Sequence, residues 1–300
     1  MDLIQDILRL KQERNATIVA HYYQDGEIQD IADKVGDSFE LSRYCASTDK
    51  PVIVFCGVHF MAESAKILSP EKTVLLPAIN AGCPMADMAG VDALLKMKAR
   101  YPEAAVVSYV NTTAAVKAES DICCTSSIAV KVVRSLPQKQ IIFLPDRNLA
   151  HYVAQQVPEK EFIFWPGFCP THNVLSIMHV QEARAAHPDA LLAIHPEAPP
   201  DVVALADFAG STKQILEFCT SNPAKEFIIG TEEGILHQLK KLNPDKSFHM
   251  LRYSFICPNM KKTSLEVLHQ SLSEMKHKIE LDRETIEKAS ASLERMLAVR

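Results

Sequence analysis

Three apolar stretches of similar pattern decide the fold: ATIVAHYY at residues 16–23, AAVVSYVN at 104–111 and ALLAIHPE at 190–197. The second begins 88 residues after the first, and the third begins 86 residues after the second. Each is typical of a strand, because a short aliphatic run ends in polar residues. Self-similarity at a nearly fixed separation indicates a repeated structural unit.

The same separations recur along the rest of the chain. A Cys-Pro pair closes each copy, at Cys83-Pro84, Cys169-Pro170 and Cys257-Pro258, with separations of 86 and 88. The closing loop of the second copy is therefore two residues shorter than the others. Three further sets of residues repeat the separations of 88 and 86: Ser38, Ser126 and Thr212; Ile53, Ile141 and Phe227; and Lys72, Lys160 and Lys246.

Each copy alternates helical and strand-like segments. Amphipathic helices are predicted at 3–12, 93–100 and 180–187, each followed by a Val/Ile/Leu-rich run that suits a strand buried on both faces. We expect helix, strand, helix, strand, helix and strand per copy. The predicted fold is α/β, with three similar three-layer α/β/α domains whose parallel sheets are related by pseudo-threefold symmetry. Functional loops lie beyond the carboxyl ends of such strands, so the active site is expected on the central axis.

We place the three repeat domains at 1–84, 85–170 and 171–260. The remaining segment, 261–300, is rich in helix-forming patterns and is expected to pack across the outside of the molecule.

The composition indicates a globular protein without a nucleic-acid partner. Of 300 residues, 47% are hydrophobic, and the net charge of −5 comes from 32 basic and 37 acidic residues spread along the chain, which leaves no basic stripe. Residues 1–10 read as an amphipathic helix and not as a signal peptide. No apolar run approaches the roughly 18 residues of a membrane span. We therefore expect a cytoplasmic protein with no membrane partner.

Eight cysteines in a reducing compartment do not predict a disulfide framework, and no two of them form a C-x-x-C pair. The symmetric Cys83, Cys169 and Cys257 would converge, and three thiolates suit zinc or an iron-sulfur cluster. Structural zinc normally takes four ligands, whereas a 4Fe-4S cluster with three cysteines leaves one iron open to substrate. The other five are expected to pack in the core: Cys45, Cys56, Cys123, Cys124 and Cys219.

Polar residues at the strand ends are candidates for substrate binding. Ser38, Ser126 and Thr212 stand where a strand gives way to a helix, so they either cap the helix or help its free N–H groups to bind an anionic substrate. Glu197 lies two residues beyond His195 and on the same side of an extended segment. It is either a general base or an exposed loop carboxylate.

Five further residues have both a functional and a structural interpretation. His21 ends the first strand and is either a site residue or a core histidine. Tyr23, Tyr109 and Asn111 either orient substrate and carry protons or satisfy backbone groups at strand ends. His172 is either a donor near the third cysteine loop or an ordinary loop histidine.

With these residues in view, the sequence resembles the quinolinate synthase family over essentially its whole length. Together the matching strings are highly specific, and the family fold of three α/β domains around a pseudo-threefold axis agrees with the repeat. The strings are His21-Tyr22-Tyr23-Gln24, Gly36-Asp37-Ser38, Cys83-Pro84-Met85-Ala86, Tyr109-Val110-Asn111-Thr112, Thr125-Ser126-Ser127, Cys169-Pro170-Thr171-His172, His195-Pro196-Glu197, Gly210-Ser211-Thr212 and Cys257-Pro258-Asn259-Met260-Lys261.

The resemblance implies an enzyme that condenses iminoaspartate with dihydroxyacetone phosphate, giving quinolinate, phosphate and water in de novo NAD biosynthesis. It also implies that Cys83, Cys169 and Cys257 bind one oxygen-sensitive 4Fe-4S cluster, whose open iron acts as a Lewis acid. Iminoaspartate is unstable in water, so a transient encounter with L-aspartate oxidase or aspartate dehydrogenase is expected.

Glu197 and Tyr23 are the leading acid/base residues that the resemblance implies, and Tyr109 and His195 are also assigned to catalysis. The implied substrate contacts are His21, Ser38, Tyr109, Asn111, Ser126, His172, His195, Glu197, Ser211 and Thr212.

Two positions depart from the family pattern: Tyr22, where asparagine is common, and Lys213, where glycine is common. The lysine either alters phosphate contacts or points outward. The chain lacks the C-terminal C-x-x-C pair of some longer members. Two rival functions stay open: another cluster-dependent hydro-lyase, and a non-catalytic repeat scaffold that binds zinc. We also expect loop closure near Tyr23 and Tyr109, because a cavity shared by three domains must open for entry.

Overall fold

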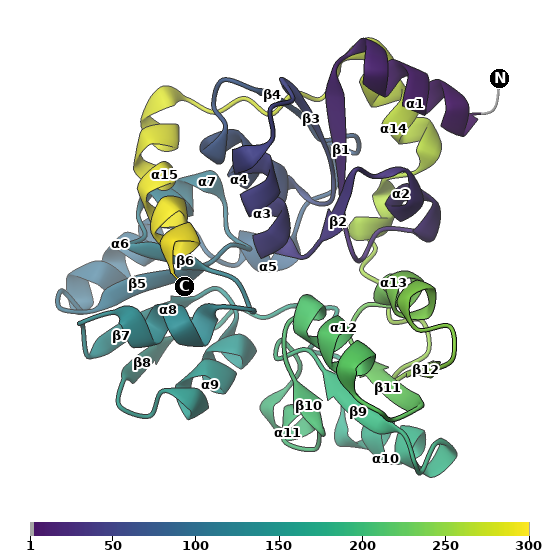
Figure 1. The fold of residues 1–300 in the computed structure, drawn as a ribbon. Helices are drawn as coiled ribbons and strands as arrows, with labels where there is room; N and C mark the ends of the chain where they lie inside the picture. Colours follow the sequence, from purple (N-terminus) through teal and green to yellow (C-terminus); the bar gives the residue numbers. More distant parts are fainter. Residues whose placement is uncertain (1–2, 300) are drawn as a thin grey trace.

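The computed structural model describes residues 3–299 and contains three parallel sheets flanked by helices (Figure 1). The predicted class, three similar α/β units, is confirmed. The strands are, in the first unit, β1 (Ala16–His21), β2 (Lys34–Gly36), β3 (Val52–Cys56) and β4 (Thr73–Leu75); in the second, β5 (Ala105–Tyr109), β6 (Ile122–Cys124), β7 (Gln140–Leu144) and β8 (Glu161–Phe164); and in the third, β9 (Leu191–Ile194), β10 (Phe208–Ala209), β11 (Glu226–Gly230) and β12 (Ser247–Met250).

The three sheets share one topology, in which the order along the sheet is second, first, third and fourth strand. The chain thus reverses direction across the sheet between the first and third strands. In parallel α/β sheets such a switch point opens a crevice at the carboxyl ends of the strands, and ligands bind there. The domain boundaries themselves remain a prediction.

The expectation of three strands per unit is wrong by one. The second strand of each sheet has only two or three residues and lies at an edge, so it leaves no apolar pattern in the sequence. A carboxylate before each of these strands accepts the backbone N–H of the first strand: Asp33 from Ile18, Asp121 from Val106 and Asp207 from Leu192, at 2.7–2.8 Å. These aspartates have the same separations of 88 and 86, a signal that the sequence analysis missed.

The helices of the described chain connect the strands and cover the sheets (Figure 1). They are α1 (Leu3–Glu13), α2 (Gly26–Ile31), α3 (Ser38–Ser47), α4 (His59–Leu68), α5 (Pro84–Asp87), α6 (Val91–Arg100), α7 (Ala114–Ala118), α8 (Ala129–Ser135), α9 (Arg147–Gln156), α10 (Ile177–Ala186), α11 (Pro200–Val203), α12 (Thr212–Ser221), α13 (Ile235–Leu242), the 3-10 turn η1 (Met260–Lys262), α14 (Leu265–Glu274) and α15 (Arg283–Ala298).

The repeated lysines tie the third helix of each unit to its last strand. Lys72 donates to the carbonyls of Cys45 and Thr48 at the end of α3. Lys160 and Lys246 make the matching contacts at the C-terminal ends of α8 and α12. A cation satisfies the free carbonyls at a helix C-terminus and interacts favourably with the helix dipole, which explains why lysine recurs there.

The C-terminal segment packs across the outside of two units. Helix α14 lies against α1, and α15 lies against α4, α7 and β6, so it bridges the first and second units (Figure 1). Its contact face buries Ala289, Leu293 and Met296 completely. Among the described helices, none is long and apolar enough to cross a membrane.

Candidate active site

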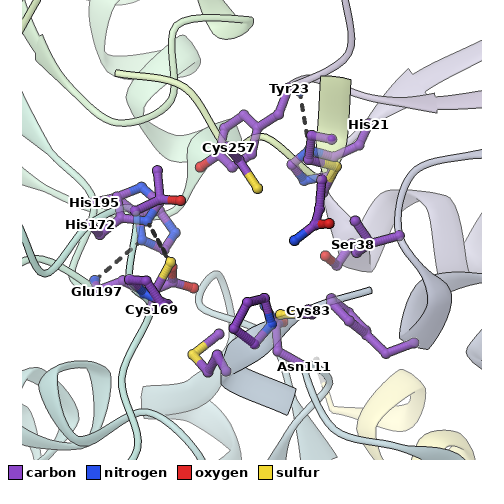
Figure 2. Close-up of a pocket in the computed structure, with 18 of the residues that line it drawn as sticks. His21, Tyr23, Ser38, Cys83, Asn111, Cys169, His172, His195, Glu197 and Cys257 are labelled. Carbon is purple, nitrogen blue, oxygen red and sulfur yellow. Dashed lines mark hydrogen bonds and ion pairs between the residues drawn. The ribbon is translucent and has the colours of Figure 1, made fainter. Parts of the chain in front are cut away.

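A cavity of about 140 Å³ lies where loops of all three units meet (Figure 2). It lies at the carboxyl ends of β1, β5 and β9, where parallel sheets of this strand order are expected to bind ligands. Ser211 is the one predicted site residue that does not line it. The predicted residues that do are His21, Tyr23, Ser38, Cys83, Tyr109, Asn111, Ser126, Cys169, His172, His195, Glu197, Thr212 and Cys257.

Each unit contributes one cysteine from the loop that follows its last strand. Cys83 of the first unit, Cys169 of the second and Cys257 of the third all line the same cavity (Figure 2). These three are half-buried, whereas the other five cysteines are buried. Burial raises the pKa of the Cys83 thiol to about 12 and raises the pKa of Cys169 and Cys257 as well, so a metal must displace their protons on binding.

One set of metal-binding side chains around the cysteines has donor atoms that all lie within 4.8 Å of one another: Cys169, His172 and Glu197. Cys83 and Cys257 are not part of it. A single zinc ion needs its thiolates at bonding distances of about 2.3 Å. A cluster takes one cysteine per iron, so it can be held by thiols that stand farther apart.

Glu197 sits at the centre of a buried hydrogen-bond network. Its carboxylate accepts from the hydroxyl of Tyr109 at 2.7 Å and lies 2.9 Å from Nδ1 of His172. The other ring nitrogen of His172 lies 2.9 Å from the hydroxyl of Thr231, a residue that the sequence analysis did not identify. The interpretation of Glu197 as an exposed loop carboxylate is wrong, because the residue is only 4% exposed.

Burial and neighbours set the protonation of this network. Burial alone would raise the pKa of Glu197, but the two histidines beside it and the Tyr109 hydroxyl outweigh burial and hold that pKa below its usual range. Burial, followed by the Glu197 charge, raises the pKa of Tyr23 and Tyr109 well above the usual range. This network therefore holds one ionised carboxylate, Glu197, and two neutral phenols near pH 7.

The two histidines at the strand ends are neutral at the same pH. Burial and then the neighbouring His195 lower the pKa of His21 to about 3. Burial lowers the pKa of His195 to about 4, although Glu197 opposes the shift. Nε2 of His195 lies 3.2 Å from the hydroxyl of Ser126, which links the second and third units.

Tyr23 crosses from the first unit into the third. Its hydroxyl lies 2.8 Å from Oγ1 of Thr212 and 2.6 Å from Oγ1 of Thr231. The buried side-chain oxygen of Asn111 also lines the cavity and has no hydrogen-bond partner among the described residues. An orphaned buried acceptor in a cavity is explained by a ligand that donates to it.

The interpretation of Ser38, Ser126 and Thr212 as helix caps is wrong. Helix α8, which follows Ser126, has Ile128 at its N-cap position and no side-chain cap. Helix α3 is capped by Asp37 and α12 by Ser211, each in a reciprocal capping box. Ser38 and Thr212 are the first residues inside these helices and face the cavity. Ser211 was predicted to contact substrate, but it serves as the cap instead. Its hydroxyl accepts from the backbone N–H of Gln214 and does not line the cavity.

The two departures from the family pattern meet at one residue of the first unit. Tyr22 donates to Glu40 at 3.0 Å, and the Lys213 ammonium pairs with the same carboxylate at 3.1 Å. Lys213 therefore serves a contact between α3 and α12, and it does not line the cavity.

Two buried carboxylates missed by the sequence analysis support the cysteine loops. Asp146 accepts from the backbone N–H of Cys169 at 3.0 Å, and Glu232 accepts from that of Cys257 at 3.2 Å. Burial raises the pKa of Asp146 to about 8 and that of Glu232 to about 7. They stand 86 residues apart, within the repeat series, and Val58 occupies the matching position in the first unit.

The fold and site define a pseudo-threefold α/β protein whose central cavity joins three thiols to a buried carboxylate and imidazoles. Residues 5–298 match the family described as Quinolinate synthetase A protein, and the chain belongs to that family.

Similar proteins include the following three, each named quinolinate synthase. That of Caldicellulosiruptor bescii is 55% identical over 295 residues, covering 98% of this chain and 97% of the relative. That of Caldicellulosiruptor saccharolyticus is 57% identical over 293 residues with the same coverage. That of Geobacter metallireducens is 55% identical over 295 residues, again with 98% and 97% covered.

Proposed function

We propose that this chain is a quinolinate synthase that condenses iminoaspartate with dihydroxyacetone phosphate to give quinolinate, phosphate and water in NAD biosynthesis. The observation that carries the proposal is the convergence of three Cys-Pro loops, one from each unit, on the cavity that holds Glu197. Family membership and relatives at 55% identity support it.

Cys83, Cys169 and Cys257 would hold a 4Fe-4S cluster. Their three thiols suit a cluster that keeps one iron open, and they do not form a compact group for a single ion. When bound, the cluster supplies a Lewis acid for substrate oxygen and nitrogen groups.

Glu197 is the proposed general base. Condensation requires a proton to leave the carbon of iminoaspartate that attacks the second substrate, and Glu197 is ionised and desolvated. Tyr109 and Tyr23 keep their protons because their pKa values are raised, so they can donate to departing oxygen atoms but cannot act as bases. The neutral His21 and His195, together with His172, orient substrate through ring nitrogens.

Anionic groups of the substrates would bind at the helix starts. Ser38 and Thr212 place hydroxyls at the cavity-lining starts of α3 and α12, both ten-residue helices whose N-terminal dipoles favour anions. Ser126 and Asn111 add polar groups from the second unit. These four residues are proposed contacts for carboxylates and phosphate.

The instability of iminoaspartate implies an enzyme upstream that delivers it. We infer transient contact with L-aspartate oxidase or aspartate dehydrogenase, and a cytoplasmic location, where five buried cysteines stay reduced.

The test is quinolinate formation by protein purified without oxygen, with dihydroxyacetone phosphate and freshly generated iminoaspartate. Quinolinate should appear only when both substrates are present. A protein that retains its cluster, forms no quinolinate and dehydrates another polycarboxylate would establish the hydro-lyase alternative. Zinc without iron or sulfide would establish the scaffold alternative.

A further inference from the structure

Lys261 lies four residues beyond Cys257 and lines no part of the cavity, yet its ammonium joins two units. It donates to the backbone carbonyl of Tyr23 at 2.7 Å and lies 3.1 Å from Oε1 of Glu232. Asp25 is a weaker third partner at 3.4 Å. One side chain therefore connects the end of β1 in the first unit to the third unit.

Glu232 carries this connection to the cysteine loop. It is fully buried, and its two oxygen atoms accept the backbone N–H groups of Cys257, at 3.2 Å, and of Gly234, at 2.7 Å. A buried carboxylate needs a compensating cation. Among the described residues, its only ion-pair partner is Lys261.

The segment around Tyr23 packs tightly against residues of the third unit and of the Cys257 loop. A methyl group on Gly234 would come within 2.7 Å of the Tyr23 backbone, so the two segments touch. The side chain of the neighbouring Gln24 donates to the carbonyl of Met260 at 2.7 Å. The segment that presents the Tyr23 phenol is thus fixed to the segment that presents the Cys257 thiol.

We propose that Lys261 is a positioning residue that couples the Cys257 loop to Tyr23, through the chain Tyr23 carbonyl, Lys261 ammonium, Glu232 carboxylate and Cys257 N–H. The phenol then reaches the cavity only while the cysteine loop holds its ligating conformation. The inference rests on the proposed function for the roles of Tyr23 and Cys257. The coupling between the segments that carry these two residues does not depend on that function.

The test compares Lys261→Met with Lys262→Met in the cluster-loaded protein. Lys262 is the next residue and donates to a single exposed carbonyl, that of Asn80, so it is a matched control. In Lys261→Met, amide exchange at 22–25 and at 257–261 should rise together by at least tenfold. Lys262→Met should exchange like the wild type, and Lys261→Arg should restore part of the protection.

A kinetic readout separates positioning from general destabilisation. Lys261→Met should lower kcat at least tenfold with little change in KM and with wild-type iron content. Glu232→Gln keeps an acceptor for the Cys257 N–H, and its effect on exchange should not add to that of Lys261→Met. Wild-type exchange at 22–25 in Lys261→Met, or additive effects, would overturn the proposal. Exchange needs no turnover, so a failure of the quinolinate assay is a separate result.

A second feature, independent of the cavity, lies at the opposite end of the third sheet. His187 follows α10, Glu226 begins β11 and His249 lies in β12. Strand register pairs Glu226 with Ser247, two residues before His249, so both side chains occupy one face. Nδ1 of His187 and Nε2 of His249 approach the same Glu226 oxygen, at 3.1 and 2.8 Å.

Hydrogen bonding does not account fully for this arrangement. The two imidazole rings stack with centroids 3.5 Å apart, and the buried Nε2 of His249 makes no hydrogen bond of acceptable geometry within the described chain. Among the described residues, no lysine or arginine pairs with Glu226. Two imidazoles and one carboxylate, with donor atoms within 4.8 Å of one another, form a donor set that suits a divalent transition metal.

We infer that His187, Glu226 and His249 form a binding site for a zinc-like divalent cation. Anaerobic calorimetric titration of the cluster-loaded protein with Zn²⁺ should show one site that His249→Asn and Glu226→Gln each weaken at least tenfold. His269→Asn is the control, because His269 pairs with Asp6 alone at 2.7 Å and should leave this binding unchanged. Equal affinity in the wild type and His249→Asn would overturn the assignment.

Discussion

Glu197 shows how its surroundings give one carboxylate a defined role. The side chain is buried, which by itself disfavours the charge, yet hydrogen bonds and imidazoles keep it ionised. Tyr23 and Tyr109 keep their protons because burial, followed by the Glu197 charge, raises their pKa. The sequence placed Glu197 and His195 on one side of a strand end. It could not show the contacts of Tyr109, which comes from the end of β5, or of His172, which comes from the loop after Cys169.

Glu197→Gln should reduce quinolinate formation by about 10²–10⁴-fold, because the amide cannot accept a proton but keeps the size of the side chain. Iron and sulfide content should match the wild type. Asp201→Asn, in α11 of the same unit, is a control that should retain full activity. Activity of Glu197→Gln within a few-fold of the wild type would exclude Glu197 as the base.

The lowered pKa values of His21 and His195 lead us to expect that the protein loses stability in mild acid. Their folded pKa values, about 3 and about 4, lie below the ordinary 6.5, so below pH 6.5 the unfolded chain binds protons that the folded chain does not. The free energy of unfolding should therefore fall as the pH drops, by about 2 kcal/mol per histidine between pH 7 and 5.

Urea unfolding of cluster-free protein at pH 7 and 5 measures this loss. His21→Gln should remove its share, so that the variant loses about 2 kcal/mol less than the wild type between the two pH values. An identical pH dependence in both proteins would show that His21 titrates normally.

At the scale of elements, the starts of α3 and α12 use one residue as the helix cap and the next residue to line the cavity. The sequence marked the hydroxyl residues as a repeat but did not distinguish a cap from the first helical residue, because the two positions differ by one residue and share a composition. The structure assigns capping to Asp37 and Ser211. The short edge strands were missed for a related reason, since two or three residues carry no periodicity.

Asp37→Ala and Ser38→Ala should therefore have opposite effects. Loss of the Asp37 cap should lower the free energy of unfolding by about 1 kcal/mol. Ser38→Ala should leave it within about 0.5 kcal/mol and should raise KM for one substrate roughly tenfold, because a hydrogen bond to a charged group is lost. Denaturant unfolding and steady-state kinetics on the two variants check this. A destabilised Ser38→Ala with unchanged KM would reverse the assignment.

At the scale of the whole molecule, most of the predicted architecture followed from the sequence repeat. Equal separations in many residue series established three similar units, and parallel α/β topology then placed their loops around one centre. Contacts between units could not be predicted, because they depend on the relative placement of the sheets. Tyr23 with Thr231, Lys213 with Glu40 and the Lys261 connection all belong to this class.

The Tyr23 hydroxyl contacts two threonines of the third unit beside the cavity, and we expect this contact to open when substrate enters. Amide exchange near Tyr23 and Tyr109 should slow when quinolinate is bound, relative to the ligand-free protein. Identical protection in both states would show that these loops do not close on the ligand.

The convergence of the cysteines is tested by single substitutions. Cys83→Ala, Cys169→Ala and Cys257→Ala should each abolish cluster binding, because the proposed cluster takes one thiolate from each of the three units that line the cavity. Cys219→Ala should retain the cluster, because Cys219 is buried in α12 away from the cavity. Wild-type iron in any of the first three would remove that cysteine from the ligand set.

The three-cysteine cluster is tested by measuring iron and acid-labile sulfide per chain, together with the visible absorption, in protein purified without oxygen. We predict a brown protein with about four irons and four sulfides per chain. A colourless protein that takes up neither element after anaerobic reconstitution would contradict the central claim that three units bring three cysteines to one cluster.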